Sequence, residues 1–366
     1  MNVEQIIFYL LLFPLTVLLL VVIYNYFTAP RFLNQKVYLE NNPLVSVLIP
    51  ARNEEDNIAE CIKSILNQSY KNIEIIVCDD NSTDNTESEV LQFDSYKIKL
   101  IKGEELRKGW LGKNWACYQL SKQANGDHLL FIDADVRITA NAVEYAMGTM
   151  QKNNIKMLSC FSTQKIISFG ERLIVPLVNW LLLTFLPLKK VLTSKNEKFA
   201  AANGQFILFE RKKYFEIGGH EAVRNNIVED MEFARILKSK GEKIITLLGN
   251  NIVNCRMYKS FGESVKGFSK NFYPGFKTNS AAFLFLITLL FMSFVLPFVL
   301  AFQNYFYLVH VIIIISMRIL LSLMSNQNVS FNLLLHPLQM VMMFLIGVNS
   351  IYTNLTKKAE WKGRQV

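Results

Sequence analysis

Three short clusters of acidic, amide and hydroxyl side chains each follow an apolar stretch of the sequence. They are PARNE at residues 50–54, CDDNSTD at 78–84 and DAD at 133–135. In the last cluster Asp133 and Asp135 place two carboxylates on one short turn. Hard cations such as Mg²⁺ and Mn²⁺ prefer carboxylate oxygens together with substrate phosphates. The pair therefore suits a metal that bridges to a diphosphate, although an isolated DxD more often forms an ordinary polar turn.

The middle cluster also has two interpretations. Asp, Asn and Ser are common turn formers, and Asp84 with Glu87 would make a helix N-cap pair. Alternatively, a carboxylate at a strand end accepts hydrogen bonds from a nucleobase or a ribose. Residues 78–84 taken alone fit both interpretations equally well.

The elements that would position these clusters alternate between strands and helices. Apolar and β-branched runs predict strands at 45–49, 73–77, 97–101, 128–132, 157–161 and 206–209. Helical spacing of apolar residues predicts helices at 58–66, 85–93, 114–124, 141–151 and 230–240. This alternation is typical of an α/β fold with a mostly parallel sheet and flanking helices. Ligands of such a sheet bind beyond the carboxyl ends of the strands, where the three clusters lie.

Apolar stretches at both ends of the chain predict membrane helices. Of the 366 residues, 51% are apolar. Residues 6–27 contain no Asp, Glu, Lys or Arg, and about 20 such residues in a helix cross a bilayer core. Three further apolar stretches lie at 281–302, 305–324 and 331–352. No small-residue cleavage site follows the first stretch, so we expect a permanent anchor and not a signal peptide.

These stretches divide the chain into four expected parts. They are an N-terminal transmembrane anchor at 1–30, a cytosolic globular domain at 44–278, C-terminal membrane segments at 279–354 and a basic tail at 355–366. The middle part is long enough to bury one sizeable core. All five cysteines lie in it without the spacing of a zinc site or a disulfide framework, which agrees with a reducing cytosol.

The net charge of +9 does not indicate nucleic-acid binding, because the prominent basic residues flank the apolar stretches. They are Arg31, Lys36, Lys357, Lys358, Lys362 and Arg364. Anionic lipid headgroups explain this placement. If all three late stretches crossed the membrane, however, the basic tail would lie outside the cell, against the positive-inside tendency. We therefore expect one of them to be re-entrant or interfacial, with Arg318, or His336 and Pro337, as the markers.

Taken together and in order, the clusters resemble glycosyltransferase family 2. The similarity covers about residues 45–243, a little over half of the chain, and includes Glu229 and Asp230 as a fourth motif. It implies the GT-A fold, a nucleotide-sugar donor and a Mg²⁺ or Mn²⁺ ion. Carried over to this sequence, it implies that Pro50, Asn53, Glu54 and Asp80 surround the nucleoside of the donor, with Asp80 at the base.

The same resemblance assigns the reacting groups. It implies that Asp133 lies near the ribose, that Asp135 ligates the metal and that Lys113 lies beside the donor diphosphate. Asp230 matches the catalytic base, next to Glu229. Outside this pattern, such a lysine is commonly a solvated surface residue, and a Glu-Asp pair more often complements a helix dipole.

A fifth segment resembles the part of the family that lies beside the donor sugar. It is Asn203-Gly204-Gln205, where a glycine lets the backbone approach a ligand closely. His220 is a minor candidate for the same site, although a lone histidine is more often structural.

Within the family, the chain resembles the carotenoid-acid glucosyltransferases of staphyloxanthin-type pathways. After these, it resembles hopanoid-associated glycosyltransferases. The similar residues are 109–119, 336–338 and 360–365. The resemblance implies UDP-glucose as the donor and a product in which the sugar forms an ester with a polyene carboxylic acid. Such an acid is already ionised near pH 7, so Asp230 would orient the acceptor more than deprotonate it. Polyprenyl phosphates, hopanoids and glycerolipids are alternative acceptors. Residues 267–271 lack the Gln- or Arg-x-x-Arg-Trp motif of processive members, so we expect single-sugar transfer. The resemblance implies that this transfer inverts the configuration of the sugar.

The sequence does not indicate an oligomeric state. Two other functions fit parts of the sequence. A nucleotidyltransferase would need a Gly- and Lys-rich phosphate loop, which residues 50–54 do not form. A membrane scaffold or transporter that only binds nucleotide should carry paired polar groups in its spans, whereas Arg318 is the one charged residue there. The apolar stretch 173–188 fits either an interfacial segment beside the lipid-like acceptor or a buried core helix.

Overall fold

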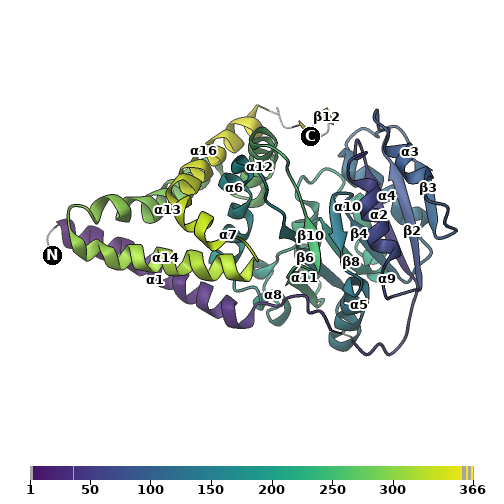
Figure 1. Ribbon diagram of the computed structural model, residues 1–366, viewed down its shortest axis with the longest axis horizontal. Helices are drawn as coiled ribbons and strands as arrows, with labels where there is room; N and C mark the ends of the chain where they lie inside the picture. Colours follow the sequence, from purple (N-terminus) through teal and green to yellow (C-terminus); the bar gives the residue numbers. More distant parts are fainter. Residues whose placement is uncertain (1–2, 36, 357–359, 362–363, 366) are drawn as a thin grey trace.

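The computed structural model describes residues 3–35, 37–356, 360–361 and 364–365. Four of the flanking basic residues, Lys36, Lys357, Lys358 and Lys362, lie outside the described residues. The structure has a mixed α/β domain from which long apolar helices extend to one side (Figure 1).

A seven-stranded sheet forms the centre of the α/β domain, in the order β3-β2-β1-β4-β8-β6-β9. Its strands are β1 (Val45–Ala51), β2 (Ile73–Asp79), β3 (Ile98–Lys102), β4 (His128–Ile132), β6 (Met157–Phe161), β8 (Phe206–Glu210) and β9 (Ile244–Leu248). All neighbouring pairs are parallel except the two that β8 makes, with β4 and with β6. The prediction of a mostly parallel sheet is therefore confirmed.

Helices cover both faces of this sheet because its strands are apolar on both sides. Along β1, Val47 and Ile49 pack on one core and Leu48 packs on the other. The first core is closed by α2 (Ile58–Leu66), α3 (Thr86–Leu91) and α5 (Ala142–Asn153). The second is closed by α4 (Gly112–Gln123) and α11 (Glu229–Ser239) together with residues of the membrane helices. The apolar helices and the domain thus share one continuous core.

A second, three-stranded sheet lies beside the first. Its order is β5 (Val136–Ile138), β10 (Val253–Cys255) and β7 (Thr163–Gln164). Strands of two or three residues are too short to show an alternating pattern, so the sequence did not predict them. Short helices complete the domain: α8 (Lys190–Thr193), η1 (Glu197–Phe199), α9 (Arg211–Glu216) and α10 (Gly219–Ala222).

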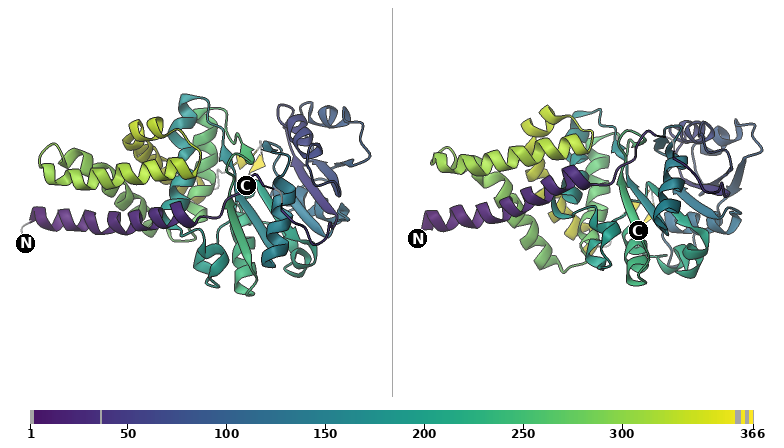
Figure 2. Two further views of the ribbon diagram at one scale, coloured as in Figure 1. Left: turned by 60° about the horizontal axis from the view of Figure 1, so that its bottom comes forward. Right: turned by 90° about the horizontal axis from the view of Figure 1, so that it is seen from below.

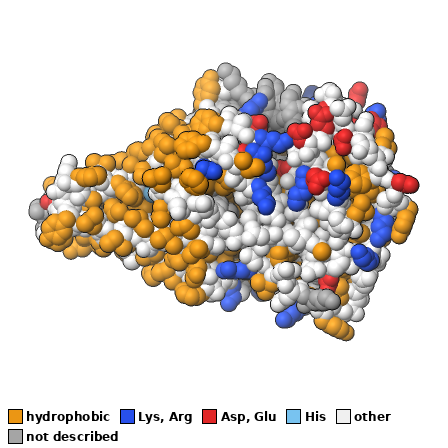
Figure 3. All heavy atoms as spheres, in the orientation of Figure 1, with side chains coloured by type: hydrophobic (Ala, Val, Ile, Leu, Met, Phe, Trp, Pro, Cys, Tyr) orange, Lys and Arg blue, Asp and Glu red, His pale blue; other side chains and the backbone are white. Residues whose placement is uncertain are grey.

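Four helices are long and apolar enough to cross a membrane, by length and composition, in the described part of the chain. They contain α1 (Val3–Thr28), α13 (Ser280–Leu300), α14 (Leu308–Met324) preceded by η2 (Tyr305–Tyr307), and α16 (His336–Leu355). Hydrophobic side chains dominate the tapered end of the molecule, whereas charged side chains gather over the α/β domain (Figure 3). At the tapered tip, Asn304 Nδ2 donates to Glu4 Oε1 at 2.6 Å.

The third late stretch is broken at Leu335 into α15 (Val329–Leu334) and α16. Pro337 lies in the first turn of α16, where its missing N–H needs no partner within the helix. α1 and α14 lie side by side along the long axis of the molecule, whereas α16 is steeply inclined to them (Figures 1 and 2). α16 packs instead on α6 (Phe169–Ile174), α12 (Phe261–Gly275) and α13.

The stretch 173–188 mostly forms α7 (Pro176–Phe185), which packs against α1 and α14. Trp180 and Leu183 are buried, and Phe185 is 40% exposed. Asn25 of α1, itself buried, donates to Leu183 O at 2.8 Å and accepts from Leu188 N at 2.8 Å. These contacts favour the buried-helix interpretation for most of the stretch.

Candidate functional site

The loops that follow β1 and β2 are joined into one platform. Arg52 Nη1 donates to the carbonyl oxygen of Asp80 at 2.6 Å, and Asp80 N donates to Ala51 O at 2.8 Å. Thr83 N donates to Asn53 Oδ1 at 2.8 Å, and Asn53 adopts a positive φ of 51°, which asparagine tolerates better than most residues. The predicted nucleoside residues Asn53 and Asp80 therefore lie on one rigid edge.

The remaining two predicted nucleoside residues belong to the same edge. Pro50 is in β1, paired with Cys78 of β2. Glu54 N donates to Thr86 Oγ1 at 2.8 Å, and Glu54 Oε2 accepts from Asn57 Nδ2 at 2.8 Å. The structure thus brings these residues together, while their contact with a nucleoside stays a prediction.

The Asp133–Asp135 turn leaves β4 next to this platform. Asp133 Oδ1 pairs with Lys113 Nζ at 2.6 Å. Asp135 Oδ1 is buried without a hydrogen bond of ordinary geometry among the described residues, although the Cys255 thiol lies beside the carboxylate. Burial raises the pKa of Asp135 to about 7, the carboxylates of Asp133 and Glu54 add to this rise, and the neighbouring thiol opposes it. Two carboxylates that repel each other on one turn are poised to gain a positive partner.

The predicted base lies across the same cluster. Asp230 Oδ2 accepts from Gly204 N at 2.8 Å, and Asp230 Oδ1 accepts from Met231 N at 2.7 Å, so the carboxylate is held in one orientation. Lys113 Nζ lies 3.7 Å from Glu229 Oε1. Burial, reinforced by Glu229, raises the pKa of Asp230 to about 7.

Lys113 connects the two carboxylate pairs. Burial alone would lower the pKa of Lys113, but the carboxylates of Asp133 and Glu229 outweigh that effect and raise it. The lysine therefore stays charged at neutral pH. Gly204 closes the cluster: a Cβ atom there would lie 3.1 Å from Lys113 Nζ and 3.2 Å from Glu229 Oε1. Gly204 thus lies close to two charged side chains of the cluster, while its close approach to a donor sugar stays a prediction.

These residues fit a divalent cation shared with a substrate. The unpartnered Asp135 Oδ1 and the adjacent Asp133 offer hard oxygen ligands of the kind Mg²⁺ and Mn²⁺ prefer. No group of three or more His, Cys, Asp or Glu side chains that could hold a metal occurs among the described residues. A cation held here would therefore need substrate oxygens to complete its coordination.

One charged residue near the cluster was not predicted. Lys270 lies on α12, where burial lowers its pKa to about 8 while the carboxylates of Glu229 and Asp133 oppose that change. Its ammonium group is thus within electrostatic reach of the site. The only signal in the sequence was its place after the predicted base, inside residues 267–271.

His220 lies in an aromatic core and does not extend into the cluster. Its Nδ1 atom is 2.7 Å from the hydroxyl oxygen of Tyr214, and its ring contacts Phe131 and Phe233. Burial lowers the pKa of His220 to about 3, so the ring is neutral. These contacts are those of a structural histidine. The five cysteines are buried and free.

Comparison with protein families identifies the region that carries these motifs. Residues 46–215 match the model of Glycosyl transferase family 2. The match includes the platform, Lys113, the Asp133–Asp135 turn and Gly204.

Two curated relatives match parts of the chain. A UDP-Glc:alpha-D-GlcNAc-diphosphoundecaprenol beta-1,3-glucosyltransferase from Escherichia coli is 39% identical over 115 residues, which cover 31% of this chain and 44% of that protein. A 4,4'-diaponeurosporenoate glycosyltransferase from Staphylococcus haemolyticus is 26% identical over 253 residues, which cover 68% of this chain and 66% of that protein. The chain thus spans less than two thirds of each of these relatives.

A solved structure shares the overall fold. It is a mannosyltransferase from Pyrobaculum calidifontis in complex with GDP-Man and Mn²⁺, with a TM-score of 0.55 and 16% sequence identity. The similarity covers 93% of this chain and 94% of that chain, so it extends beyond the α/β domain to the apolar helices.

Proposed function

We propose that this chain, whose residues 46–215 form a glycosyltransferase family 2 domain of GT-A fold, transfers glucose from UDP-glucose to a carotenoid-type carboxylic acid dissolved in the membrane. The observation that carries the proposal is the position of the Lys113, Asp133 and Asp230 cluster. It lies within electrostatic reach of Lys270 on α12, and only four residues separate α12 from α13, the first late membrane helix. The donor sugar and the acceptor in the membrane would therefore meet near the junction of α12 and α13.

Each part of the site has a task in the proposed reaction. Asn53 and Asp80 hold the nucleoside, and the Lys113 ammonium group lies against the diphosphate. The carboxylate oxygen of the acceptor attacks the anomeric carbon while the bond from that carbon to the diphosphate oxygen breaks. The configuration inverts and UDP leaves. Asp230, fixed by Gly204 N, orients the acceptor.

The metal has a defined place in this scheme. A divalent cation held by Asp135 and Asp133 would neutralise charge on the leaving diphosphate. Lys113 already pairs with Asp133, so the chain supplies part of the compensating charge itself.

Support for the acceptor comes from the membrane helices and from the relatives. The name of one curated relative specifies a GlcNAc carried by diphosphoundecaprenol, and the name of the other specifies the carboxylate 4,4'-diaponeurosporenoate. Apolar surface is worth ~25 cal/mol per Å² on leaving water, so such a chain is scarce in solution and concentrated in lipid. The catalytic domain, flanked by α1 and α13, would meet it there, with the domain in the cytosol.

The test is mass spectrometry of lipid extracts from cells with and without the protein, followed by reconstitution with UDP-glucose. We expect a product heavier than the acid by one hexose, and we expect mild base to cleave it because the link is an ester. A product that resists base would instead indicate a glycoside of an alcohol. Donor binding without any lipid product would refute the proposed acceptor class.

A further inference from the structure

Lys270 brings a second positive charge to the reacting cluster. Its ammonium group is within electrostatic reach of Glu229, Asp133 and Lys113. Lys113 is already engaged, because its Nζ atom lies 2.6 Å from Asp133 Oδ1 and 3.7 Å from Glu229 Oε1. By contrast, no described residue forms an ion pair or a hydrogen bond with the Lys270 ammonium group. The described residues therefore leave the charge of Lys270 available to a ligand.

Tight packing fixes the face of α12 that carries Lys270. A Cβ atom at Gly267 would overlap the phenol ring of Tyr258, so the helix is pressed against that ring. Burial raises the pKa of Tyr258, and the Asp135 carboxylate adds to this rise, so the ring lies near that carboxylate. Residues three apart share one face of a helix, and Lys270 therefore lies on the same face as Gly267. This face is turned toward the turn that carries Asp135.

The other end of α12 is fastened to the helix that carries the predicted base. Arg235 Nη2 of α11 donates to the last carbonyl oxygen of α12 at 3.4 Å. Lys277, just after α12, pairs with Glu232 of α11. Asp230 is in the first turn of the same α11. Lys270 thus lies between two attachments of α12, one beside the metal-binding turn and one on the helix of the base.

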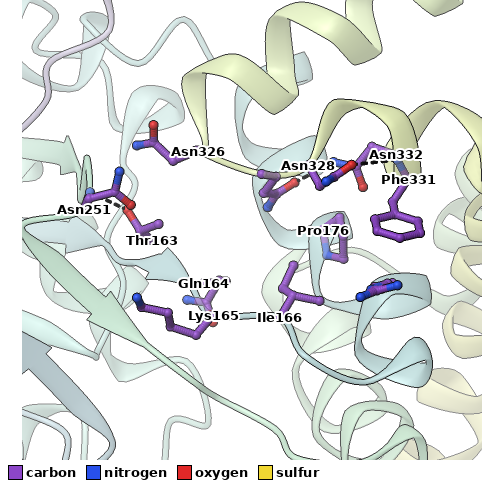
Figure 4. A pocket seen from close by; sticks show the side chains of 12 residues that line it. Thr163, Gln164, Lys165, Ile166, Pro176, Asn251, Asn326, Asn328, Phe331 and Asn332 are labelled. Carbon is purple, nitrogen blue, oxygen red and sulfur yellow. Dashed lines mark hydrogen bonds between the residues drawn. The ribbon is translucent and has the colours of Figure 1, made fainter.

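A cavity of about 300 Å³ between the α/β domain and the membrane helices does not offer such a place (Figure 4). Half of its described lining residues are carboxamides, including Gln164 and Gln327. Its cations are an exposed Lys165 and a partly exposed Arg172. Gln164 Nε2 donates to Gln205 Oε1 at 3.1 Å, and this pair separates the cavity from the reacting cluster. A carboxylate held in the cavity could not attack the anomeric carbon.

An ionised acceptor needs a positive group at the reacting cluster itself. The acidic side chains there are Asp133, Asp135, Glu229 and Asp230. Lys113 offsets part of their charge, and a divalent cation and the donor diphosphate would largely offset each other. A further carboxylate is repelled by the others unless a cation pairs with it, because like charges interact strongly in a site that excludes water. Lys270 is placed to supply that cation.

We propose that the Lys270 ammonium group binds the carboxylate of the acceptor and so selects polyene acids over polyene alcohols. This inference rests on the proposed function and assigns the residue that recognises its acceptor class. One carboxylate oxygen accepts a hydrogen bond from Lys270 and the other attacks the anomeric carbon, while the bond from that carbon to the diphosphate oxygen breaks. Four residues after α12 the chain enters α13, so the polyene would extend from this point into the bilayer.

The binding test uses the full chain in phosphatidylcholine nanodiscs with Mn²⁺ and UDP, so that no sugar is transferred. The probes are radiolabelled retinoic acid and retinol, which share one polyene chain, and binding to empty nanodiscs is subtracted. We expect Lys270→Gln to weaken retinoic acid binding at least ~10-fold, as for the loss of a charged hydrogen bond, and to leave retinol binding unchanged. Lys270→Arg keeps the charge and should keep most of the affinity.

Turnover and a matched control complete the test. Lys212→Gln removes an exposed lysine on α9 and should bind both probes like the unaltered chain. With UDP-glucose and retinoic acid, Lys270→Gln should raise the KM for the acid at least ~10-fold and change kcat less, since the ion pair forms on binding. The affinity for UDP-glucose, measured in parallel, should be equal in all variants.

The outcomes separate the lysine from the proposed function. If retinoic acid binds in the Lys270-dependent way but receives no glucose, the proposed transfer fails and the carboxylate contact stands. Unchanged retinoic acid affinity in Lys270→Gln, or retinol that binds the unaltered chain as tightly as retinoic acid, would overturn the contact. A loss of UDP-glucose affinity as large as the loss of acid affinity would also overturn it, because Lys270 would then bind the donor diphosphate.

Discussion

At the scale of single residues, Asp135 combines a buried oxygen atom without a partner and two carboxylate neighbours, Asp133 and Glu54. A divalent cation would relieve both, because it supplies positive charge and accepts the free oxygen as a ligand. We expect Asp135→Asn to abolish sugar transfer and to remove the increase in melting temperature that Mn²⁺ gives the unaltered chain. Thermal melts with and without Mn²⁺ measure this. An equal Mn²⁺ shift in the variant would exclude Asp135 as a ligand.

Gly204 permits a sharper test of the cluster geometry. An added Cβ atom would lie 3.1 Å from Lys113 Nζ and 3.2 Å from Glu229 Oε1, closer than most real contacts. We expect Gly204→Ala to lower kcat at least ~10-fold, since small misplacements of reacting groups are costly. The matched control is Gly262→Ala, because a Cβ atom at Gly262 meets nothing within 4 Å. Equal kcat values for both variants would mean that the close approach at Gly204 has no role.

The raised pKa of Asp230 leads to a prediction about pH. A general base acts only when it is deprotonated. For an alcohol acceptor, the rate would therefore fall tenfold for each pH unit below about 7. The Asp230→Asn variant would lose ~10²–10⁴-fold of the rate with such an acceptor. An ionised acid needs no base. With a carotenoid acid and saturating Mn²⁺, which keeps Asp135 ionised, we therefore expect kcat/KM not to fall as the pH drops below 7. We expect Asp230→Asn to lower kcat/KM less than ~10-fold. A limb near 7 that disappears in Asp230→Asn would show that the residue is a base.

Individual residues of the site were predictable only where the chain itself groups them. Asp133 and Asp135 are two residues apart, and Asn53 and Glu54 are adjacent, so short motifs reveal them. Lys270 follows Asp230 by forty positions and comes near Glu229 only because α12 packs back onto the domain. The cavity residues Gln164 and Gln327 are still further apart in sequence.

At the scale of elements, one buried polar side chain ties α1 to α7 and to the residues that follow α7. Asn25 donates to Leu183 O and Leu186 O, each at 2.8 Å, and accepts from Leu188 N. Removing it leaves buried backbone groups without partners, which costs about 1–3 kcal/mol each. We expect Asn25→Ala to lower the melting temperature and lipid transfer while UDP-glucose affinity is kept, because the nucleotide platform lies elsewhere.

The control for this variant lies on the same helix. Thr16 Oγ1 donates to Leu12 O within α1, so Thr16→Val removes a hydroxyl without breaking a contact between helices. A melting temperature of Asn25→Ala equal to that of Thr16→Val would show that Asn25 does not fasten α7.

Elements were predictable in proportion to their length and periodicity. All six predicted strands are present to within about two residues, because apolar runs such as 128–132 are buried on both faces. β9 follows a lysine-rich turn and was missed. The break at Val175 between α6 and α7 follows from Pro176, but the packing of α7 on α1 involves Asn25, far away in the chain.

At the scale of the whole molecule, the inclination of α16 bears on the sidedness of the C-terminus. α16 is tied to α12 by Asn349 Nδ2, which donates to Ser269 Oγ at 2.8 Å, and by Ser350 Oγ, which accepts from Tyr273 N at 2.9 Å. If α1, α13 and α14 cross while α16 lies in the interface, the basic tail stays on the side of the α/β domain. This arrangement resolves the conflict with the positive-inside tendency.

Single cysteines can test that sidedness, because the five native cysteines are buried. We expect a membrane-impermeant maleimide to label Asn304→Cys in intact cells, since the residue lies at the tip of the apolar helices. Thr356→Cys should be labelled only after permeabilisation. Labelling of both variants in intact cells would mean that α16 also crosses.

The joining of the domain to α1 at one end and to α13 at the other has a kinetic consequence. If the acceptor is dissolved in the bilayer, as we propose, enzyme and acceptor share a surface, and the acceptor concentration that the site meets is a mole fraction of the bilayer and not an amount per volume of water. Adding empty vesicles that fuse with the acceptor-bearing membrane would slow the reaction at constant bulk concentration, whereas diluting the whole suspension with buffer at fixed UDP-glucose would not. On this proposal, the domain would meet its lipid by diffusion in two dimensions and its nucleotide sugar by diffusion in three.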